Sequence, residues 1–404
     1  MGSSLDTNVP VVVINRPFDD GAVGVARTLG RLGVPVYVLA QEGLRSPVWF
    51  SRFWVEKFRG DFTAPEDECL AFMLDVGRTV GARHGVRPVL LTFSDRSSVF
   101  IERHADALAE QFVFPRAPHP VIHRLVNKWE MHLLAQERGI PTPATIGVRS
   151  PEDAERFHEL GGFPIVLKSA DPFLAHAPAS GILASEAELR EVVQAETAFG
   201  QLNFILQEYI PGDAESVWMC NGYFGDETDH TVIYTGKKLR QVTSTGRASL
   251  AVCLPNETVA TQTREFMRGV GYRGCVGIGW RFDSRDGLYK VLDVNARVSG
   301  VFRLFAGTND MDVVRAAYRD LTGQPIPSTA LRAGRKWMLE DDFPAALRLM
   351  RGRELTATQW IASMRGLREL QWFAIDDPLP FLRWLSGRAR GFAGDRLPRS
   401  RRSR

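Results

Sequence analysis

Cysteine is scarce and unpatterned in this 404-residue chain. Its four cysteines, Cys69, Cys220, Cys253 and Cys275, form no Cys-x-x-Cys pair, and none lies at metal-site spacing from a pair of histidines. A chain of this length can bury a large core and does not need disulfides to fold. We therefore expect four reduced and mostly buried thiols, and neither a disulfide framework nor a cysteine metal site.

Long apolar runs and a strong net charge are also missing. No stretch of about 18 or more apolar residues occurs, so the sequence has no candidate membrane-spanning helix. Residues 1–10 are polar and lack the basic and then apolar pattern of a secretory signal, and a cytoplasmic location is expected. The 50 basic and 47 acidic residues give a net charge of +3. Because the charge is so balanced, we expect no nucleic-acid partner.

Positive charge is nevertheless concentrated at the C-terminal end. Residues 388–404 contain seven arginines and one aspartate, and the rest of the chain has 43 basic and 46 acidic residues. Because glycine, proline and serine interrupt these arginines, we expect 388–404 to be a disordered basic tail. The tail is either an inert, solubilising terminus or the site of a weak peripheral membrane contact. For that contact, the apolar and aromatic residues at 380–385 would supply anchors.

Alternating strand and helix signals organise the first part of the chain. Apolar runs predict strands at 11–14, 36–39, 53–58 and 88–92, and helical patterns occur at 22–32, 64–83 and 95–110. This alternation is typical of a parallel sheet covered by helices. We place this α/β domain at residues 1–117, where a cluster of prolines marks its end.

Two further patterns precede a Trp-rich C-terminal segment. Mixed signals predict a small α+β subdomain at 118–205, and a region richer in strand signals predicts a larger subdomain at 206–330. Residues 331–387 give mostly helical signals, and we expect a helical C-terminal extension there. The predicted fold class is therefore α/β and α+β.

Two lysines stand at the ends of predicted elements. Lys128 begins a helix, and Lys168 ends the apolar strand 163–167. A lysine at the end of a buried strand must reach solvent, a carboxylate or an anionic ligand, because its charge is not stable in the core. Two interpretations remain. Each lysine extends its ammonium group to the surface, or both bind a polyphosphate beside the loop 170–181, which is rich in small residues and proline.

Two later segments combine a strand with polar residues. Residues 207–215 are the end of a predicted strand, a turn and then acidic residues. Their backbone groups could hydrogen-bond the edge of an adenine, and their acids could accept from ribose hydroxyls. An ordinary turn with solvated acids is the alternative. Asp293 and Asn295 are two positions apart on a strand and so share a face. Two oxygen ligands on one face suit Mg²⁺ bridged to phosphates, and Arg297 follows on the same face, where it suits a carboxylate or acyl phosphate. An edge strand with a polar face is the alternative.

The order of these motifs over about 120–300 resembles the ATP-grasp superfamily, and most of all the carboxylate–amine ligases related to D-aspartate ligase. The N-terminal domain resembles the domain that precedes the ATP-grasp domain in those enzymes. The resemblance implies ATP as cofactor, with Mg²⁺ or alternatively Mn²⁺. The implied ATP contacts are Lys128 and Lys168 for the phosphates, Gln207, Glu208, Tyr209 and Ile210 for adenine, and Glu215 or alternatively Asp213 for ribose.

The metal motif departs from the family pattern. The closing motif is usually Glu-x-Asn-Pro-Arg, and here the residues are Asp293-Val294-Asn295-Ala296-Arg297. The family also carries a metal carboxylate on the preceding strand, near Gly279-Trp280, where this sequence has none. Asp283 is the nearest acid, so either it replaces the missing ligand or the metal site is weakened.

The resemblance implies an ATP-dependent ligase that activates a carboxylate as an acyl phosphate and joins it to an amine. Arg297 would steady the acyl phosphate, and Arg240 and Arg247 are further anion contacts or parts of a solvated basic turn. The loops 16–21 and 94–97 would set specificity for small-molecule carboxylate and amine substrates. The sequence carries no signal for an oligomeric state.

Two other function classes are considered. The first is a non-catalytic ATP-binding or scaffold protein, which the missing carboxylate favours. The second is a nicotinamide oxidoreductase, because residues 20–24 follow a strand and open a helix. Those residues do not form Gly-x-Gly-x-x-Gly, however, and no acid ends the second strand.

Overall fold

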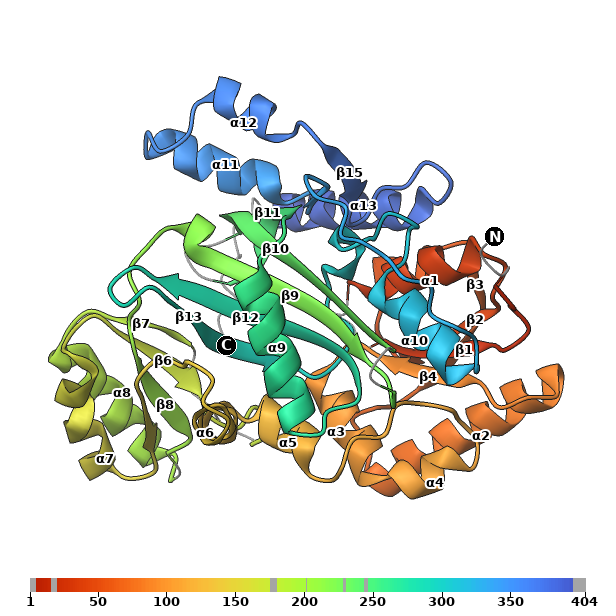
Figure 1. The fold of residues 1–404 in the computed structure, drawn as a ribbon, viewed down its shortest axis with the longest axis horizontal. Coiled ribbons are helices and arrows are strands. Elements are labelled where there is room, and N and C mark those ends of the chain that lie inside the picture. The colour runs from red at the N-terminus through yellow and green to blue at the C-terminus, as the bar shows by residue number, and fades with distance from the viewer. Residues whose placement is uncertain are drawn as a thin grey trace, which may run out of the picture.

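The computed structural model describes residues 5–15, 20–174, 180–200, 202–227, 230–242 and 246–394. The described chain forms three sheets with helices packed around them (Figure 1). One sheet is parallel, one is antiparallel, and the largest is antiparallel except at one edge. The predicted mixture of α/β and α+β architecture is confirmed.

The N-terminal sheet is parallel, with strand order β3-β2-β1-β4. Every residue of β1 and β2 is buried, as expected for apolar strands covered on both faces. The strands are β1 (Val11–Asn15), β2 (Val36–Gln41), β3 (Trp54–Gly60) and β4 (Val89–Thr92). The helical elements are α1 (Ala22–Gly30), η1 (Pro47–Phe50), α2 (Glu66–His84), α3 (Asp95–Arg103) and α4 (Ala105–Ala109).

A small antiparallel sheet follows, with strand order β5-β8-β6-β7. Its strands are β5 (Thr145–Val148), β6 (Ile165–Ser169), β7 (Gly181–Leu183) and β8 (Phe204–Glu208). Its helical elements are α5 (Val121–Val126), α6 (Lys128–Glu137), α7 (Pro151–Glu155), η2 (Arg156–Leu160) and α8 (Glu186–Ala198). A capping box begins α7: Ser150 accepts from the backbone of Asp153, whose side chain accepts from the backbone of Ser150.

The large sheet has the strand order β13-β12-β9-β10-β11-β14-β15, and α9 lies across one of its faces (Figure 1). Its strands are β9 (Val217–Phe224), β10 (Thr231–Gln241), β11 (Ala248–Cys253), β12 (Gly274–Asp283), β13 (Leu288–Asn295), β14 (Lys336–Met338) and β15 (Leu367–Leu370). The helical elements are η3 (Ala214–Ser216), α9 (Glu257–Gly269), η4 (Phe302–Leu304), α10 (Val313–Leu321), α11 (Asp342–Arg351), α12 (Ala357–Ser363) and α13 (Leu379–Gly394). All four cysteines are free and buried, as predicted.

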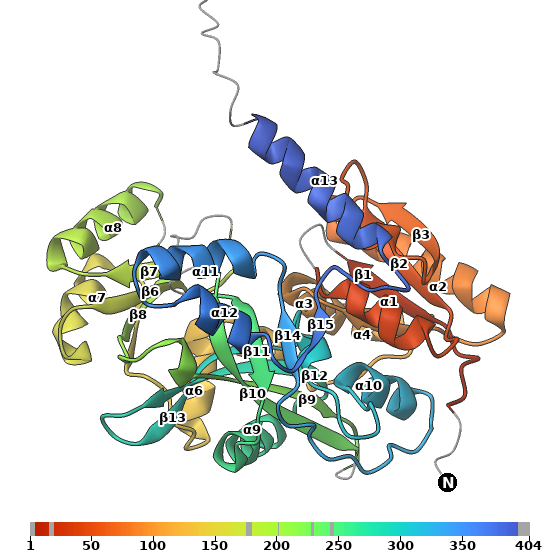
Figure 2. The same cartoon turned by 90° about the horizontal axis from the view of Figure 1, so that it is seen from above.

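The C-terminal segment corrects two expectations. Residues 331–387 are not purely helical, because β14 pairs with β11 and β15 pairs with β14, which extends the large sheet. Strands of three or four residues carry too little periodicity to be read from sequence. Residues 388–394 continue α13 rather than starting a disordered tail, and residues 395–404 lie outside the described part of the chain. Figure 2 shows α13 projecting from the body beside the N-terminal sheet.

A buried ion pair joins the two ends of the chain. The Arg27 side chain is 1% exposed and its Nε donates to Asp377 at 3.0 Å. Arg27 also donates to the carbonyl oxygen of Trp372 at 2.6 Å, and the Ser51 hydroxyl donates to Asp377 at 2.7 Å. These bonds hold α1 of the N-terminal domain against the segment that leads into α13.

We predict that Asp377→Ala lowers the free energy of unfolding by about 3–5 kcal/mol, because it leaves the buried Arg27 charge unpaired. Asp376→Ala is the matched control. Its partner Arg31 is at 2.7 Å, but both side chains are at least 32% exposed. The expected loss there is about 0–1 kcal/mol. Urea denaturation measures both values, and equal losses would contradict the anchoring role of Arg27.

Candidate functional site

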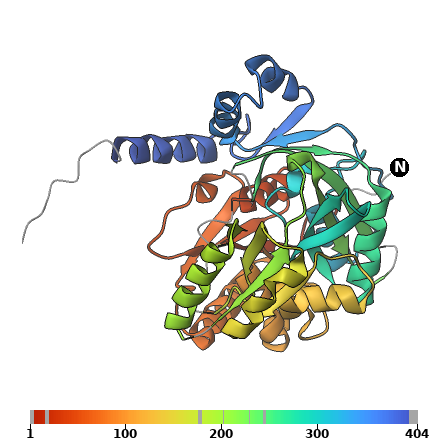
Figure 3. The same cartoon turned by 90° about the vertical axis from the view of Figure 1, so that its left-hand side faces the viewer.

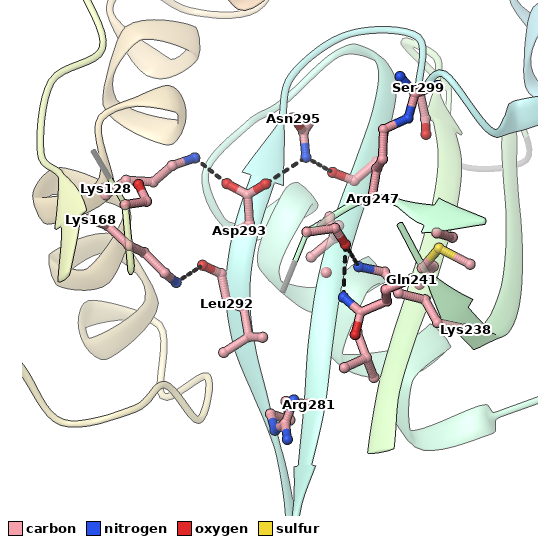
Figure 4. Close-up of a pocket in the computed structure, with 18 of the residues that line it drawn as sticks. Lys128, Lys168, Lys238, Gln241, Arg247, Arg281, Leu292, Asp293, Asn295 and Ser299 are labelled. Atoms are coloured by element: carbon pink, nitrogen blue, oxygen red, sulfur yellow. Dashed lines mark hydrogen bonds and ion pairs between the residues drawn. The ribbon is translucent and has the colours of Figure 1, made fainter. Parts of the chain in front are cut away.

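A pocket of about 810 Å³ lies where the three sheets meet. Strands β6 and β8 of the small sheet, β9, β10, β12 and β13 of the large sheet, and Asp20, Gly21 and Phe93 of the N-terminal domain line it. Figure 4 shows the polar side chains that point into it. The predicted site residues that line the pocket are Lys128, Lys168, Gln207, Glu208, Tyr209, Ile210, Asp293, Asn295 and Arg297.

The two lysines reach across the pocket from the small subdomain. Lys128 is the first residue of α6, whose N-cap Asn127 accepts from two backbone N–H groups. Its ammonium forms an ion pair with Asp293 (Figure 4). The Lys168 ammonium lies 2.9 Å from Oε1 of Gln207 and 3.2 Å from the carbonyl oxygen of Leu292. Both ammonium groups therefore face the pocket, and the surface alternative is not what the structure shows.

Positive charge exceeds negative charge among the described lining residues. The cationic side chains are Lys128, Lys168, Lys238, Arg247, Arg281 and Arg297, and the carboxylates are Asp20, Glu208 and Asp293. Burial lowers the pKa of Lys168 to about 8, and burial does the same for Lys238. A buried cation is destabilised by lost hydration, and an anionic ligand would restore the stability of its charged form. The pocket is therefore suited to a polyanion.

Asp293, Asn295 and Arg297 form one hydrogen-bonded row along the end of β13. Asn295 donates to Asp293 at 2.9 Å, and Arg297 donates to Oδ1 of Asn295 at 2.8 Å. Arg297 also donates to Asp95 at 2.9 Å, on the first turn of α3 in the N-terminal domain. Burial alone would raise the pKa of Asp293, but Lys128 and Lys168 hold it at about 2. The row therefore offers an ionised carboxylate and, beside it, an asparagine whose amide oxygen accepts from Arg297.

This donor set fits one Mg²⁺ ion. Mg²⁺ is usually held by one or two protein oxygens, with phosphates and water completing its shell. Asp293 and Asn295 supply two such oxygens. Gly279 pairs with Asp293 across the strands, and a Cβ built on it would find its nearest neighbour 3.9 Å away. The position facing Asp293 therefore has room for a side chain and carries none. The described residues contain no cluster of three acids, histidines or cysteines suited to a metal.

Asp283 does not replace the missing carboxylate. Its side chain accepts from Arg285 at 2.6 and 2.8 Å and from Lys290 at 2.8 Å. The hydrogen bonds from Arg285 hold the pKa of Asp283 well below its usual range. Asp283 pairs with Leu288 where the β12–β13 hairpin turns, and it is not among the lining residues. Its expected role as a metal ligand is therefore not supported.

The residues expected to receive adenine, 207–210 and here called the hinge, divide between the pocket and a neighbouring ion cluster. Gln207 lines the pocket and donates to Thr145 at 3.0 Å while it accepts from Lys168. The Glu208 carboxylate is tied to Arg285 at 2.6 Å and to Lys290 at 3.0 Å. Glu208 therefore has little freedom to serve a ligand through its carboxylate.

Neither acid expected to bind ribose reaches the pocket. Glu215 is 58% exposed and pairs with Lys237 at 3.3 Å. Asp213 caps the short helix η3 by accepting from the backbone of Ser216 at 3.1 Å. Both are absent from the lining. The turn after β8 therefore uses its acids for local structure.

Arg240 is not an anion contact. Its side chain is 5% exposed and forms a bidentate salt bridge with Asp342, in which the shortest N–O distance is 2.7 Å. It also donates to Ser363 at 2.8 Å. In a regular strand Arg240 would share a face with Lys238, but the register of β10 against β11 shifts between these two residues. A bulge of this kind redirects side chains, and the sequence does not reveal it.

Several residues of the site were not predicted. Lys238 and Arg281 line the pocket from β10 and β12, and Asn221 lines it with a buried side-chain oxygen for which the described chain provides no partner. The loops that the sequence indicated as parts of the site are only partly described. Asp20 pairs with Arg247 at 3.2 Å, and residues 16–19, 175–179 and 243–245 lie outside the described residues. A lysine next to a bulge or a buried asparagine gives no local sequence signal.

Comparisons with known proteins agree with this geometry. No family model matches the chain. It is 25% identical over 247 residues to D-aspartate ligase of Enterococcus faecium, covering 57% of this chain and 58% of that protein. It is 23% identical over 223 residues to the N-terminal section of the carbamoyl phosphate synthase large chain of Methanopyrus kandleri, covering 50% of this chain and 36% of that protein. The chain thus spans 58% of the length of the first relative and 36% of the length of the second.

Solved structures match over most of the chain. The L-amino acid ligase of Bacillus licheniformis has a TM-score of 0.61 at 15% identity, covering 82% of this chain and 79% of its own. N5-carboxyaminoimidazole synthetase of Staphylococcus aureus, solved with ADP, has a TM-score of 0.60 at 15% identity and covers 81% of each chain. This chain has the ATP-grasp fold. The predicted resemblance to ATP-grasp carboxylate–amine ligases is confirmed. No helix in the described part of the chain is both long and apolar enough to cross a membrane.

We predict that Lys168→Ala weakens ATP binding by about 1–3 kcal/mol, because it removes a charged hydrogen-bond donor from the pocket of this ATP-grasp fold. The stability of the nucleotide-free protein should change little. Arg240→Ala is the contrasting variant. It should lower the free energy of unfolding by about 3–5 kcal/mol, since Asp342 is left buried and unpaired, and it should leave ATP affinity unchanged.

Titration calorimetry and urea denaturation of both variants measure the two quantities. If Lys168→Ala binds ATP as tightly as the unchanged protein, Lys168 is not a phosphate contact. If Arg240→Ala loses ATP affinity while it stays folded, the assignment of Arg240 to structure alone is wrong.

Proposed function

We propose that this protein is an ATP-dependent ligase that activates a carboxylate as an acyl phosphate and joins it to an amine. One observation carries the proposal. Lys128 and Lys168 from the small subdomain and Asp293 and Asn295 from the large subdomain meet across a single pocket that the hinge residues also line. The confirmed ATP-grasp fold supports the same assignment.

The pocket divides into a nucleotide end and a substrate end. At the nucleotide end, the backbone of residues 207–210 receives adenine, and Lys128 and Lys168 hold phosphate oxygens as point charges. Asp293 and Asn295 are the residues that would hold Mg²⁺, or Mn²⁺ in its place. The metal supplies charge neutralisation between the phosphates when it is bound. Positioning and electrostatics then carry the catalysis, as in other phosphoryl transfers.

The proposed reaction has two steps. A carboxylate oxygen of the substrate attacks the γ-phosphorus of ATP, the bond to the β-phosphate oxygen breaks, and ADP leaves. The amine nitrogen then attacks the acyl carbon, the acyl C–O bond to phosphate breaks, and the amine loses a proton as phosphate leaves. Arg297, fixed between Asn295 and Asp95, lies where it would steady the negative acyl phosphate.

The substrate end carries charges of both signs. Arg247 pairs with Asp20 in the pocket lining, and Arg297 pairs with Asp95, an N-terminal-domain residue that is not part of the lining. Arginines suit a carboxylate and aspartates suit an ammonium group, so an amino acid is the proposed substrate class. The names of the D-aspartate ligase and the L-amino acid ligase that the chain resembles support this choice. The proposal places the protein in the cytoplasm, with small-molecule substrates and no nucleic-acid partner.

Release of ADP in the presence of Mg²⁺ and ATP tests the proposal. The screen combines amino acids and sugar acids as carboxylates with amino acids and simple amines as nucleophiles. ADP released only when a carboxylate is present supports the ligase. ATP binding with no ADP release across the screen would instead favour a non-catalytic nucleotide-binding protein, in keeping with the empty position at Gly279.

We predict that Asp293→Asn abolishes Mg²⁺-dependent turnover and leaves the fold intact, because it removes the only carboxylate from the described metal-binding row. Asp283→Asn is the control on the same hairpin. It should keep its dependence on Mg²⁺ and lose stability, since it weakens the contacts to Arg285 and Lys290. ADP release as a function of Mg²⁺ concentration separates the two. Asp293→Asn with full activity, or Asp283→Asn with a raised Mg²⁺ requirement, would contradict the assignment.

A further inference from the structure

Helix α13 has apolar residues on two sides, and only one side is covered. Phe381 and Trp384 pack against the core that includes the N-terminal sheet, and their rings stack 5.8 Å apart. The Arg383 guanidinium lies 4.4 Å from the centre of the Phe50 ring in η1. These contacts attach the first turns of α13 to the body and fix which side of the helix faces outward.

The outward side presents a row of leucines. Leu379, Leu382 and Leu385 are 49%, 51% and 47% exposed. They are spaced three residues apart, which keeps them on one side of a helix. Ile375, just before the helix, is 90% exposed, and Phe373 is 42% exposed. Figure 3 shows that α13 extends beyond the rest of the molecule. We call Leu379, Leu382 and Leu385 the leucine face.

Positive charge accompanies the leucine face. The described helix α13, residues 379–394, contains the three arginines Arg383, Arg388 and Arg390 and no acid. Of the arginines on the described helix, Arg383 stacks on Phe50 and Arg388 pairs with Asp341. A helix with exposed leucines and surrounding arginines has the composition of segments that lie in the interface of an anionic bilayer.

We propose that α13 is a docking surface for an anionic membrane, with the leucine face in the headgroup region and the arginines against the lipid phosphates. Charge decides between this occupant and a second copy of the chain. Two copies joined through the leucine face would bring two strongly basic segments together, which is unfavourable, whereas an anionic leaflet attracts both. The proposal goes beyond the ligase activity and does not depend on it.

Co-sedimentation of the full chain with lipid vesicles tests the proposal. Neutral phosphatidylcholine vesicles are compared with vesicles that contain phosphatidylglycerol, at low and at high salt. We expect at least about tenfold tighter binding to the anionic vesicles at low salt, and loss of that preference at high salt. Equal binding to both vesicle types, or no binding, would overturn the proposal.

A double variant, Leu382→Glu with Leu385→Glu, tests the leucine face itself. Both side chains are about half exposed, so the fold should be retained, and vesicle affinity should fall by about tenfold or more. Leu288→Glu is the matched control, since Leu288 is a leucine 44% exposed at the start of β13, outside the pocket lining and on a strand that lies away from α13 (Figures 1 and 2). It should bind like the unchanged protein. Equal loss in both variants would overturn the proposal.

Sedimentation velocity without lipid supplies the second readout. The full chain should show no concentration-dependent association that the double variant removes. Association of that kind together with absent vesicle binding would assign the leucine face to a second copy and overturn the membrane proposal. The ADP-release screen is carried out without lipid, so its failure and the failure of this proposal are independent.

Discussion

The ion pair between Lys128 and Asp293 is the contact on which the pocket depends. It joins the first residue of α6 to β13 and so links the two subdomains at the place where a nucleotide would lie. Lys168 reinforces it by donating to the backbone of Leu292 on the same strand. In the proposed complex both lysines would contact phosphate oxygens in place of protein groups. The Asp293 carboxylate would contact a metal ion in place of Lys128. The pair thus keeps two partly exposed charges neutralised until the ligand arrives.

Buried ion pairs outside the pocket hold the elements that carry it. Arg240 and Asp342 fix β10 beside α11, and Lys290 joins Asp283 to Glu208 at the hinge. Removing one partner of such a pair is costly, because the remaining charge stays buried. The arrangement explains why several charged residues near the pocket are engaged in structure and are not free for a ligand. The charged side chains that do face the pocket are mainly cations, and cations are what a nucleoside triphosphate requires.

Local sequence patterns predicted the parts of the site that depend on local geometry. The two-residue spacing of Asp293 and Asn295 on a strand placed their side chains together, and the apolar run before Lys168 placed that lysine at a strand end. The apolar β1 and β2 likewise indicated a parallel sheet covered on both faces. These features follow from helix and strand periods alone.

The misassigned and missed residues depend on contacts that are distant in the sequence or on irregular backbone. The bulge in β10 turns Arg240 away from Lys238, and Lys290 with Arg285 occupies Asp283. Asp95 meets Arg297 from a position 202 residues earlier. Strands as short as β14 have no readable period. In each case the deciding partner becomes visible only when the chain is folded.

The excess of buried positive charge gives the most direct test of the account. Free Lys168 and Lys238 have pKa values lowered to about 8, and bound ATP should raise both. Titration calorimetry of Mg-ATP at pH about 8, in buffers with different ionisation enthalpies, measures the protons exchanged on binding. Net proton uptake is expected, up to about half a proton for each lysine, and a smaller uptake in Lys168→Met. No uptake, or the same uptake in that variant, would contradict a nucleotide site built around these lysines.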